Sequence, residues 1–132
     1  MQSLFYSTGK KKTSVAKIWF FWGNNFNNKI LVNGSTINKY FSRNNLSNLA
    51  IKPLSLIELL DNYNIIIRVS GGGLSSQANA IKHGIAKSLV LKNFNYKPKL
   101  REFGFITRDS RVVERKKFGL SGARKRYQHS KR

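Results

Sequence analysis

The chain has 132 residues, the length of one ordinary domain, and 40% of them are hydrophobic, which is enough for a modest core. Its 25 Lys and Arg residues stand against 5 Asp and Glu, and the net charge of +20 indicates a polyanionic partner, most commonly nucleic acid. The absence of cysteine excludes disulfides, thiolate nucleophiles and Cys-ligated metal sites, and the short apolar runs predict no membrane span.

The first part of the chain contains two runs with the composition of strands. β-branched and aromatic residues predict a strand over residues 14–21. After an Asn-rich loop, residues 29–32 are predicted to pair back onto it as the second strand of a hairpin. Asn33 and Gly34 then supply a turn signal.

Helical segments are predicted next. Ser35 is a suitable N-cap for a short helix that ends at Phe41, and residues 42–50 add a further helical turn or two. Pro53 suits the first turn of another helix, which we expect to end near Asp61.

The second half of the chain contains the strongest secondary-structure signals. Residues 64–70 predict a strand, and the glycine triplet 71–73 leads into the longest predicted helix, residues 74–91. A short helix over residues 98–103 follows. Strands and helices in mixed order predict an α/β (α+β) domain of two layers.

The long predicted helix has two distinct faces. His83 and Lys87, four residues apart, lie together on one of them, which we expect to be polar. The apolar stripe on the other consists of Leu74, Ala78, Ile81, Ile85 and Leu89.

Positive charge is concentrated at the two ends of the chain. Residues 1–57 contain no acid, and no acid follows Glu114. The stretch 115–132 holds eight cations and few residues that a core would bury, so it does not offset the entropy cost of ordering. We therefore expect a globular domain over residues 1–108 and a long, extended basic tail over residues 109–132 that orders on a partner.

The glycine triplet invites comparison with phosphate-binding loops. The nucleotide-hydrolase pattern requires a Gly-Lys-Ser/Thr ending that is missing here, and Ser76 stands where the dinucleotide pattern needs its third glycine. The expected role of Gly71 and Gly72 is a left-handed turn and close helix–sheet packing. An RNA phosphate at the helix start is compatible with that role.

Catalytic groups are scarce. Glu58 and Asp61, three apart on a predicted helix, are expected to form a solvated acidic face. Asp109 and Glu114 lie among Arg108, Arg111 and Arg115, where ion pairs are expected. We expect no catalytic residue, no metal site, no cofactor and no enzymatic activity.

The segment GGGLSSQANAIKHGIA at residues 71–86 is diagnostic of a family. It resembles the signature of the S-nine family of small-subunit ribosomal proteins, and the resemblance covers nearly the whole chain. Further segments that resemble the family in the same order are 6–16, 32–41, 53–54, 104–111, 114–120, 123–126 and 130–132.

The resemblance implies a structural RNA-binding protein in the head of the small ribosomal subunit. Its domain is expected to have left-handed βαβ topology, and its tail is expected to pass through rRNA to the peptidyl-site tRNA. The implied partners are small-subunit rRNA, that tRNA and neighbouring head proteins, with no membrane. Lys82 and Lys87 stand where the family usually has Arg, so they keep the charge without the guanidinium fork.

The charge distribution and the resemblance together predict two sets of binding residues. The tRNA-binding residues implied by the resemblance are Ser130, Lys131 and Arg132. The expected rRNA-binding residues are Lys10, Lys11, Lys12, Lys82, His83, Lys87, Arg108, Arg111, Arg115, Lys116, Lys117, Arg124, Lys125 and Arg126.

The family motif begins by Tyr6, so we expect no cleavable presequence and a protein made in an organelle or a bacterium. The Asn, Ile and Lys bias favours an organellar ribosome, first a plastid (chloroplast), with a mitochondrion or a bacterial cytoplasm as alternatives. Two other functions stay open: a free nucleic-acid-binding protein of the nucleoid or RNA-chaperone kind, and a small kinase or hydrolase that uses the glycine triplet.

Overall fold

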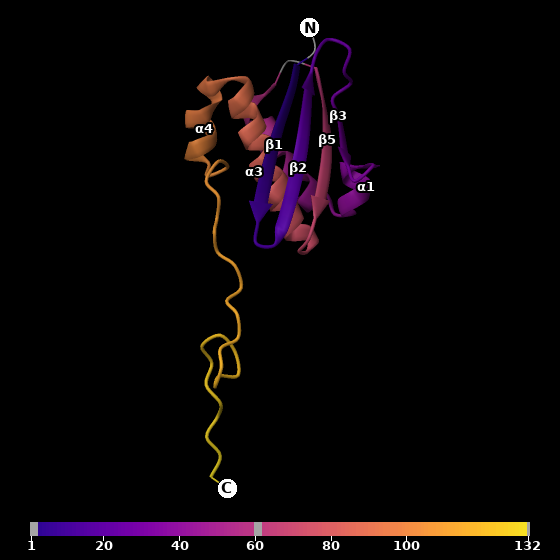
Figure 1. The fold of residues 1–132 in the computed structure, drawn as a ribbon. Coiled ribbons are helices and arrows are strands. Elements are labelled where there is room, and N and C mark those ends of the chain that lie inside the picture. The colour runs from indigo at the N-terminus through magenta and orange to yellow at the C-terminus, as the bar shows by residue number, and fades with distance from the viewer. Residues whose placement is uncertain (1–2, 60–61, 132) are drawn as a thin grey trace.

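The computed structural model describes residues 3–59 and 62–131, and within them one five-stranded sheet has the order β1-β2-β5-β3-β4 (Figure 1). The strands are β1 (Ser3–Lys11), β2 (Ser14–Trp22), β3 (Lys29–Val32), β4 (Ser35–Thr36) and β5 (Tyr63–Ser70). The helices are α1 (Ile37–Phe41), α2 (Asn44–Ile57), α3 (Leu74–Lys92), the 3-10 turn η1 (Phe94–Tyr96) and α4 (Lys97–Glu102). The expected α/β class is confirmed.

Strand β2 pairs with different neighbours from those the sequence predicts. It is antiparallel to β1 through a tight turn at Lys12 and Thr13, and antiparallel to β5 on its other edge. The predicted hairpin between residues 14–21 and 29–32 is wrong, because both edges of β2 are already occupied. The Asn-rich loop instead carries the chain past β5 to its far edge, where β3 pairs with β5 in parallel. The helices α1 and α2 connect β3 to β5 and complete a βαβ unit, whose hand stays a prediction.

Composition and periodicity assign no element to residues 3–11, where β1 forms the edge of the sheet under α3. Its small residues face the helix. A Cβ atom on Gly9 would lie 1.9 Å from the carbonyl oxygen of Ala80, and one on Gly84 would lie 2.4 Å from Ile18. The Ser7 hydroxyl donates to the carbonyl of Gly84 at 2.7 Å, in the same buried contact. The backbones of β1 and α3 are therefore in direct contact. This contact places Lys10 and Lys11 at the end of β1 beside Lys82 and His83 of α3.

Helix α2 begins earlier than the proline predicts. It is continuous from Asn44 to Ile57, so Pro53 lies inside it and not in its first turn. The proline ring is fully buried, and this packing outweighs the loss of one helical hydrogen bond. Glu58 caps the helix in a left-handed conformation, so it is not within a helix that continues to Asp61; Asp61 and the predicted helix end there lie outside the described residues.

The core lies between one face of the sheet and the helices α2 and α3. In Figure 1 α3 passes behind β1 and β2, and the opposite sheet face is uncovered. The predicted apolar stripe on α3 is buried at Ala78, Ile81, Ile85 and Leu89, whereas Leu74 is 43% exposed at the helix start. The predicted turn at Asn33 and Gly34 is confirmed, since both residues have positive φ between β3 and β4.

Beyond α4 the chain leaves the domain in irregular conformation (Figure 1). Leu100 and Phe105 are its last buried apolar side chains, and residues 107–131 are mostly exposed. The predicted short helix at 98–103 is confirmed as α4. That the tail is extended until it meets a partner stays a prediction.

Candidate nucleic-acid interface

A cleft of about 210 Å³, the basic cleft, lies where the β1–β2 hairpin, α3 and the segment after α4 meet. It brings together five of the predicted rRNA-binding residues from three distant parts of the sequence. Its lining residues are Lys10, Lys11, Asn79, Lys82, His83, Gly104, Phe105, Thr107, Arg108 and Asp109. The tight packing of Gly9 against α3 is what brings the hairpin lysines beside the helix.

His83, on α3, is hydrogen-bonded to the other two segments that line the basic cleft, the β1–β2 hairpin and the segment after α4. Its Nδ1 accepts the backbone N–H of Lys10 at 3.4 Å, so the neutral ring carries its proton on Nε2, which donates to the carbonyl of Ile106 at 3.0 Å. Burial lowers the pKa of His83 below its usual 6.5, and the charges of Lys87 and Arg108 lower it further against the opposing effect of the Ile106 carbonyl. The neutral ring is thus a structural link between the hairpin, α3 and the segment after α4.

The two lysines of α3 have different surroundings. Lys82 lies over the ring of Phe105, with Nζ 5.5 Å from the ring centroid. Its pKa is lowered by burial first, and then by the charges of Lys52 and Lys11. Lys87, one turn further along the helix, donates to the backbone carbonyl of Thr8 at 3.0 Å, outside the lining of the basic cleft.

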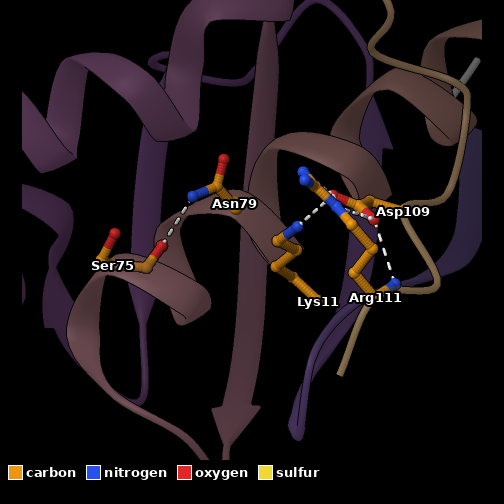
Figure 2. A network of polar contacts seen from close by, with 5 residues as sticks. All are labelled: Lys11, Ser75, Asn79, Asp109 and Arg111. Carbon is orange, nitrogen blue, oxygen red and sulfur yellow. Dashed lines mark hydrogen bonds and ion pairs between the residues drawn. The ribbon is translucent and has the colours of Figure 1, made fainter. Parts of the chain in front are cut away.

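Asp109 binds the start of the tail to the hairpin (Figure 2). Its carboxylate accepts from Lys11 Nζ at 2.5 Å, from the backbone N–H of Arg111 at 3.0 Å and from the guanidinium of Arg111 at 2.8 Å. The hydrogen bonds from Arg111 and Lys11 hold the pKa of Asp109 far below its usual range, so the carboxylate is charged. Arg111 is thereby held beside Lys12, with which it lines a second, shallower hollow.

The remaining predicted rRNA-binding residues lie along the tail and none of them lines the basic cleft in the described part of the chain. Glu114 pairs with Lys117 at 3.5 Å and Arg124 at 3.1 Å, rather than with the expected Arg115. Arg115 donates to the carbonyl of Lys116, and Arg126, Ser130 and Lys131 are exposed. Arg132 lies outside the described residues.

The glycine triplet has the predicted structural role. Gly71 and Gly72 have φ of 77° and 62°, and a Cβ atom on Gly71 would lie 2.5 Å from the Thr13 carbonyl. The carbonyl of Gly71 accepts hydrogen bonds from Ser14 Oγ at 2.9 Å and Gln77 Nε2 at 3.0 Å. The turn therefore seats the N-terminus of α3 against the β1–β2 hairpin.

Sequence reasoning missed several members of the basic cleft. Asn79 lines it and donates to the carbonyl of Ser75 at 2.9 Å (Figure 2), and Phe105 supplies the ring beneath Lys82. The predicted ion pair of Asp109 with a nearby arginine is confirmed at Arg111, but its second link, to Lys11, joins residues 98 positions apart and was not predicted. Only the isolation of this acid among cations signals its importance. Within residues 3–59 and 62–131, no three metal-ligating side chains gather and no helix has the length and apolarity to span a bilayer.

This α/β domain gathers cations from three segments in one cleft and has a basic segment after it, features typical of proteins that bind polyanions through their surface. The comparisons narrow that class. The model of the family "Ribosomal protein S9/S16" matches residues 9–132. The chain is also 46% identical over 127 residues to "Small ribosomal subunit protein uS9" of Lawsonia intracellularis (strain PHE/MN1-00), covering 96% of this chain and 95% of the relative. The chain therefore belongs to the ribosomal protein S9/S16 family, as its resemblance indicates.

Proposed function

We propose that this protein is a structural constituent of the small ribosomal subunit that binds rRNA during translation. The observation that carries the proposal is the family match over residues 9–132, together with the similarity to a small-subunit protein over nearly the full length of both chains. The net charge of +20 and the basic cleft supply the physical means of binding.

The basic cleft is suited to a phosphate group. Within residues 3–59 and 62–131, no acid pairs with Lys10, Lys82 or Arg108 at its walls, whereas Asp109 neutralises Lys11. Arg108 has the planar fork that binds two phosphate oxygens, and Lys82 acts as a point charge. Both ring nitrogens of His83 are engaged with backbone, so its contact with RNA requires exchange of one of those hydrogen bonds.

Sedimentation tests the proposed function directly. A tagged chain expressed in its own host should co-migrate quantitatively with small subunits in a gradient, as detected by mass spectrometry. A free nucleic-acid-binding protein would remain largely at the top or follow other nucleic acids. The enzyme alternative is tested by thermal shift, because a nucleotide that binds only the folded state raises the apparent stability; we expect no shift.

Paired substitutions test the basic cleft. Lys82→Gln with Arg108→Gln should weaken rRNA binding and reduce the slope of log affinity against log salt by about two, roughly one per phosphate contact. The control is Lys99→Gln with Arg101→Gln, which removes the same charge from exposed positions on α4. Equal losses in the two pairs would show that net charge, rather than the basic cleft, determines affinity.

We further propose that Ser130, Lys131 and Arg132 contact the peptidyl-site tRNA, which rests on the resemblance and on the exposure of Ser130 and Lys131. A charge-assisted contact contributes about 1.5–3 kcal/mol where water is excluded. Deleting Lys131 and Arg132 should leave assembly intact and lower tRNA affinity about tenfold in filter binding to purified subunits, since about 1.4 kcal/mol is a factor of ten. Unchanged affinity, or failed assembly, would refute this role for the terminus.

The composition supports an organellar ribosome, and we propose a plastid first. The similar protein named above is bacterial, so a bacterial ribosome is the principal alternative, with the mitochondrion next. Cell fractionation followed by detection of the intact chain distinguishes these compartments.

A further inference from the structure

The sheet face opposite the helices, which we call the open face, carries aromatic and basic side chains. Alternation along β1, β2 and β5 directs Tyr6, Lys17, Trp19, Ile66 and Arg68 to this face. No Asp or Glu occurs in β1, β2, β3 or β5, so no acid of these strands opposes the cations. The open face is therefore basic and aromatic at once.

An aromatic pair lies on the open face across the edge strand β1 and its neighbour β2. The rings of Tyr6 and Trp19, paired residues of β1 and β2, have centroids 5.4 Å apart, and Tyr6 is 49% exposed. The guanidinium carbon of Arg68 lies 5.7 Å from the Trp19 ring. Lys17 is exposed and pairs across the sheet with Arg68. These residues, with Val15, line a hollow of about 270 Å³ that the basic cleft does not include.

This combination fits unpaired nucleotides better than it fits a protein or a duplex. Exposed aromatic rings provide stacking surfaces for bases, and neighbouring cations bind the phosphates between them. A duplex keeps its base faces stacked and inaccessible. A mostly apolar hollow around Phe21, Leu31 and Ile66 also occurs, with Lys29 and Asn64 in its lining, but it lacks the arginine and exposed tyrosine of the basic, aromatic hollow.

We propose that the open face is a second RNA-binding surface, which takes unpaired nucleotides with bases on Tyr6 and Trp19 and phosphates on Lys17 and Arg68. The inference rests on the proposed function only in that RNA is the partner. The two surfaces would then bind different forms of RNA. The basic cleft would bind the phosphates of folded RNA, and the open face would bind unstacked bases of a single strand.

The test measures binding of the full-length chain to two labelled RNAs, an oligouridine of about eight nucleotides and a base-paired hairpin stem. Tyr6→Leu with Trp19→Leu should weaken oligouridine binding about tenfold or more, because each stacked base contributes that much, and should leave stem binding nearly unchanged. Lys82→Gln with Arg108→Gln should show the opposite preference. Phe94→Leu is the matched control, since Phe94 is 68% exposed with Lys97 4.8 Å from its ring centroid, but lies on η1 away from the sheet.

Each outcome decides the proposal. Equal losses on both RNAs, or a loss with Phe94→Leu as large as with the sheet variants, would overturn it. If the double variant unfolds, Arg68→Gln at an exposed position replaces it and should reduce oligouridine binding selectively. If the Tyr6→Leu, Trp19→Leu variant binds oligouridine as tightly as the wild-type chain and still sediments with small subunits, this inference alone is refuted. A wild-type chain that binds neither RNA and does not sediment with subunits refutes the proposed function as well.

Cross-linking in assembled subunits provides a second measurement. Tyr6 and Trp19 should cross-link to unpaired rRNA nucleotides. Cross-links from this face to a neighbouring protein, and none to RNA, would assign the open face to protein docking and overturn the proposal.

Discussion

The basic cleft and the tail carry the same kind of charge, but the structure holds their side chains in different ways. In the basic cleft Lys82 lies over Phe105 and Lys11 binds Asp109, while His83 joins β1, α3 and Ile106. In the tail Arg126 and Lys131 are exposed, and the ion pairs of Glu114 connect tail residues only to one another.

This difference separates two ways of binding a polyanion. The conformational entropy of the cleft lysines is lost when the domain folds, so we expect RNA to meet charges that are already placed. We expect the tail, in contrast, to lose its conformational entropy only on binding, which would let it follow an irregular path through RNA. The four predictions below test whether the two regions differ in this way.

Salt should have the largest effect, and it should act mainly through the tail. With about 6–10 phosphate contacts, rRNA affinity falls by roughly 10³–10⁵ between about 50 and 200 mM salt. Truncation after Ser110 removes the tail cations and keeps Asp109, so the salt slope should fall steeply. Filter binding over a salt series measures it. A truncated chain with the full slope would show that the domain makes nearly all the phosphate contacts.

Gly9→Ala should destabilise the domain without affecting the tail. The new Cβ would meet backbone atoms of Ala80 and Gly84, which do not yield easily, so we expect a loss of about 1–3 kcal/mol or more. Thermal unfolding measures the loss. Gly122→Ala in the tail, where the nearest neighbour is 3.7 Å away, is the control and should leave the melting temperature unchanged. A neutral Gly9→Ala would contradict the backbone contact between β1 and α3.

Asp109→Asn should loosen the junction between the two regions. The substitution weakens the carboxylate bonds to Lys11 and Arg111, so trypsin should cleave after Arg108 and Arg111 several-fold faster. In the wild-type chain we expect cleavage to concentrate at residues 115–126 and to leave a stable core. Protection of residues 115–126 in the free wild-type protein would contradict a tail that orders on its partner. Glu102→Gln on α4 is the charge-matched control.

The smallest effect we expect is a pH dependence of domain stability through His83. Its pKa in the folded protein lies below its usual 6.5, so the unfolded chain binds the proton more readily. The stabilising effect of the neutral ring is complete above about pH 6.5 and is lost as the pH falls below that value. Urea unfolding at several pH values measures it, and His83→Gln should flatten the dependence below about pH 6.5. A slope of the opposite sign would mean that the ring is charged when folded.

The elements of the fold differ in how much local sequence predicts them. β5 and α3 follow from local pattern, because a β-branched run and a helical apolar stripe are each buried on the face that the period specifies. β1 does not, because Ser7 and Gly9 are there for close contact with α3, which no local propensity scale records. Pro53 gives the wrong helix start for a similar reason: its burial against the core outweighs its local preference.

The sequence by itself determined the family, the α/β class and the large positive charge from which we predict a polyanionic partner, because motif order and composition are properties of the chain alone. Only the tertiary structure decided which side chains line the basic cleft. It joined Lys10 and Lys11 to Lys82, His83 and Arg108, and it placed Tyr6, Trp19 and Arg68 on one uncovered face. The physical reason is that a site depends on strand order and on the distance between packed backbones. Those are set by long-range pairing of β1, β2 and β5 and by the contact of Gly9 with α3.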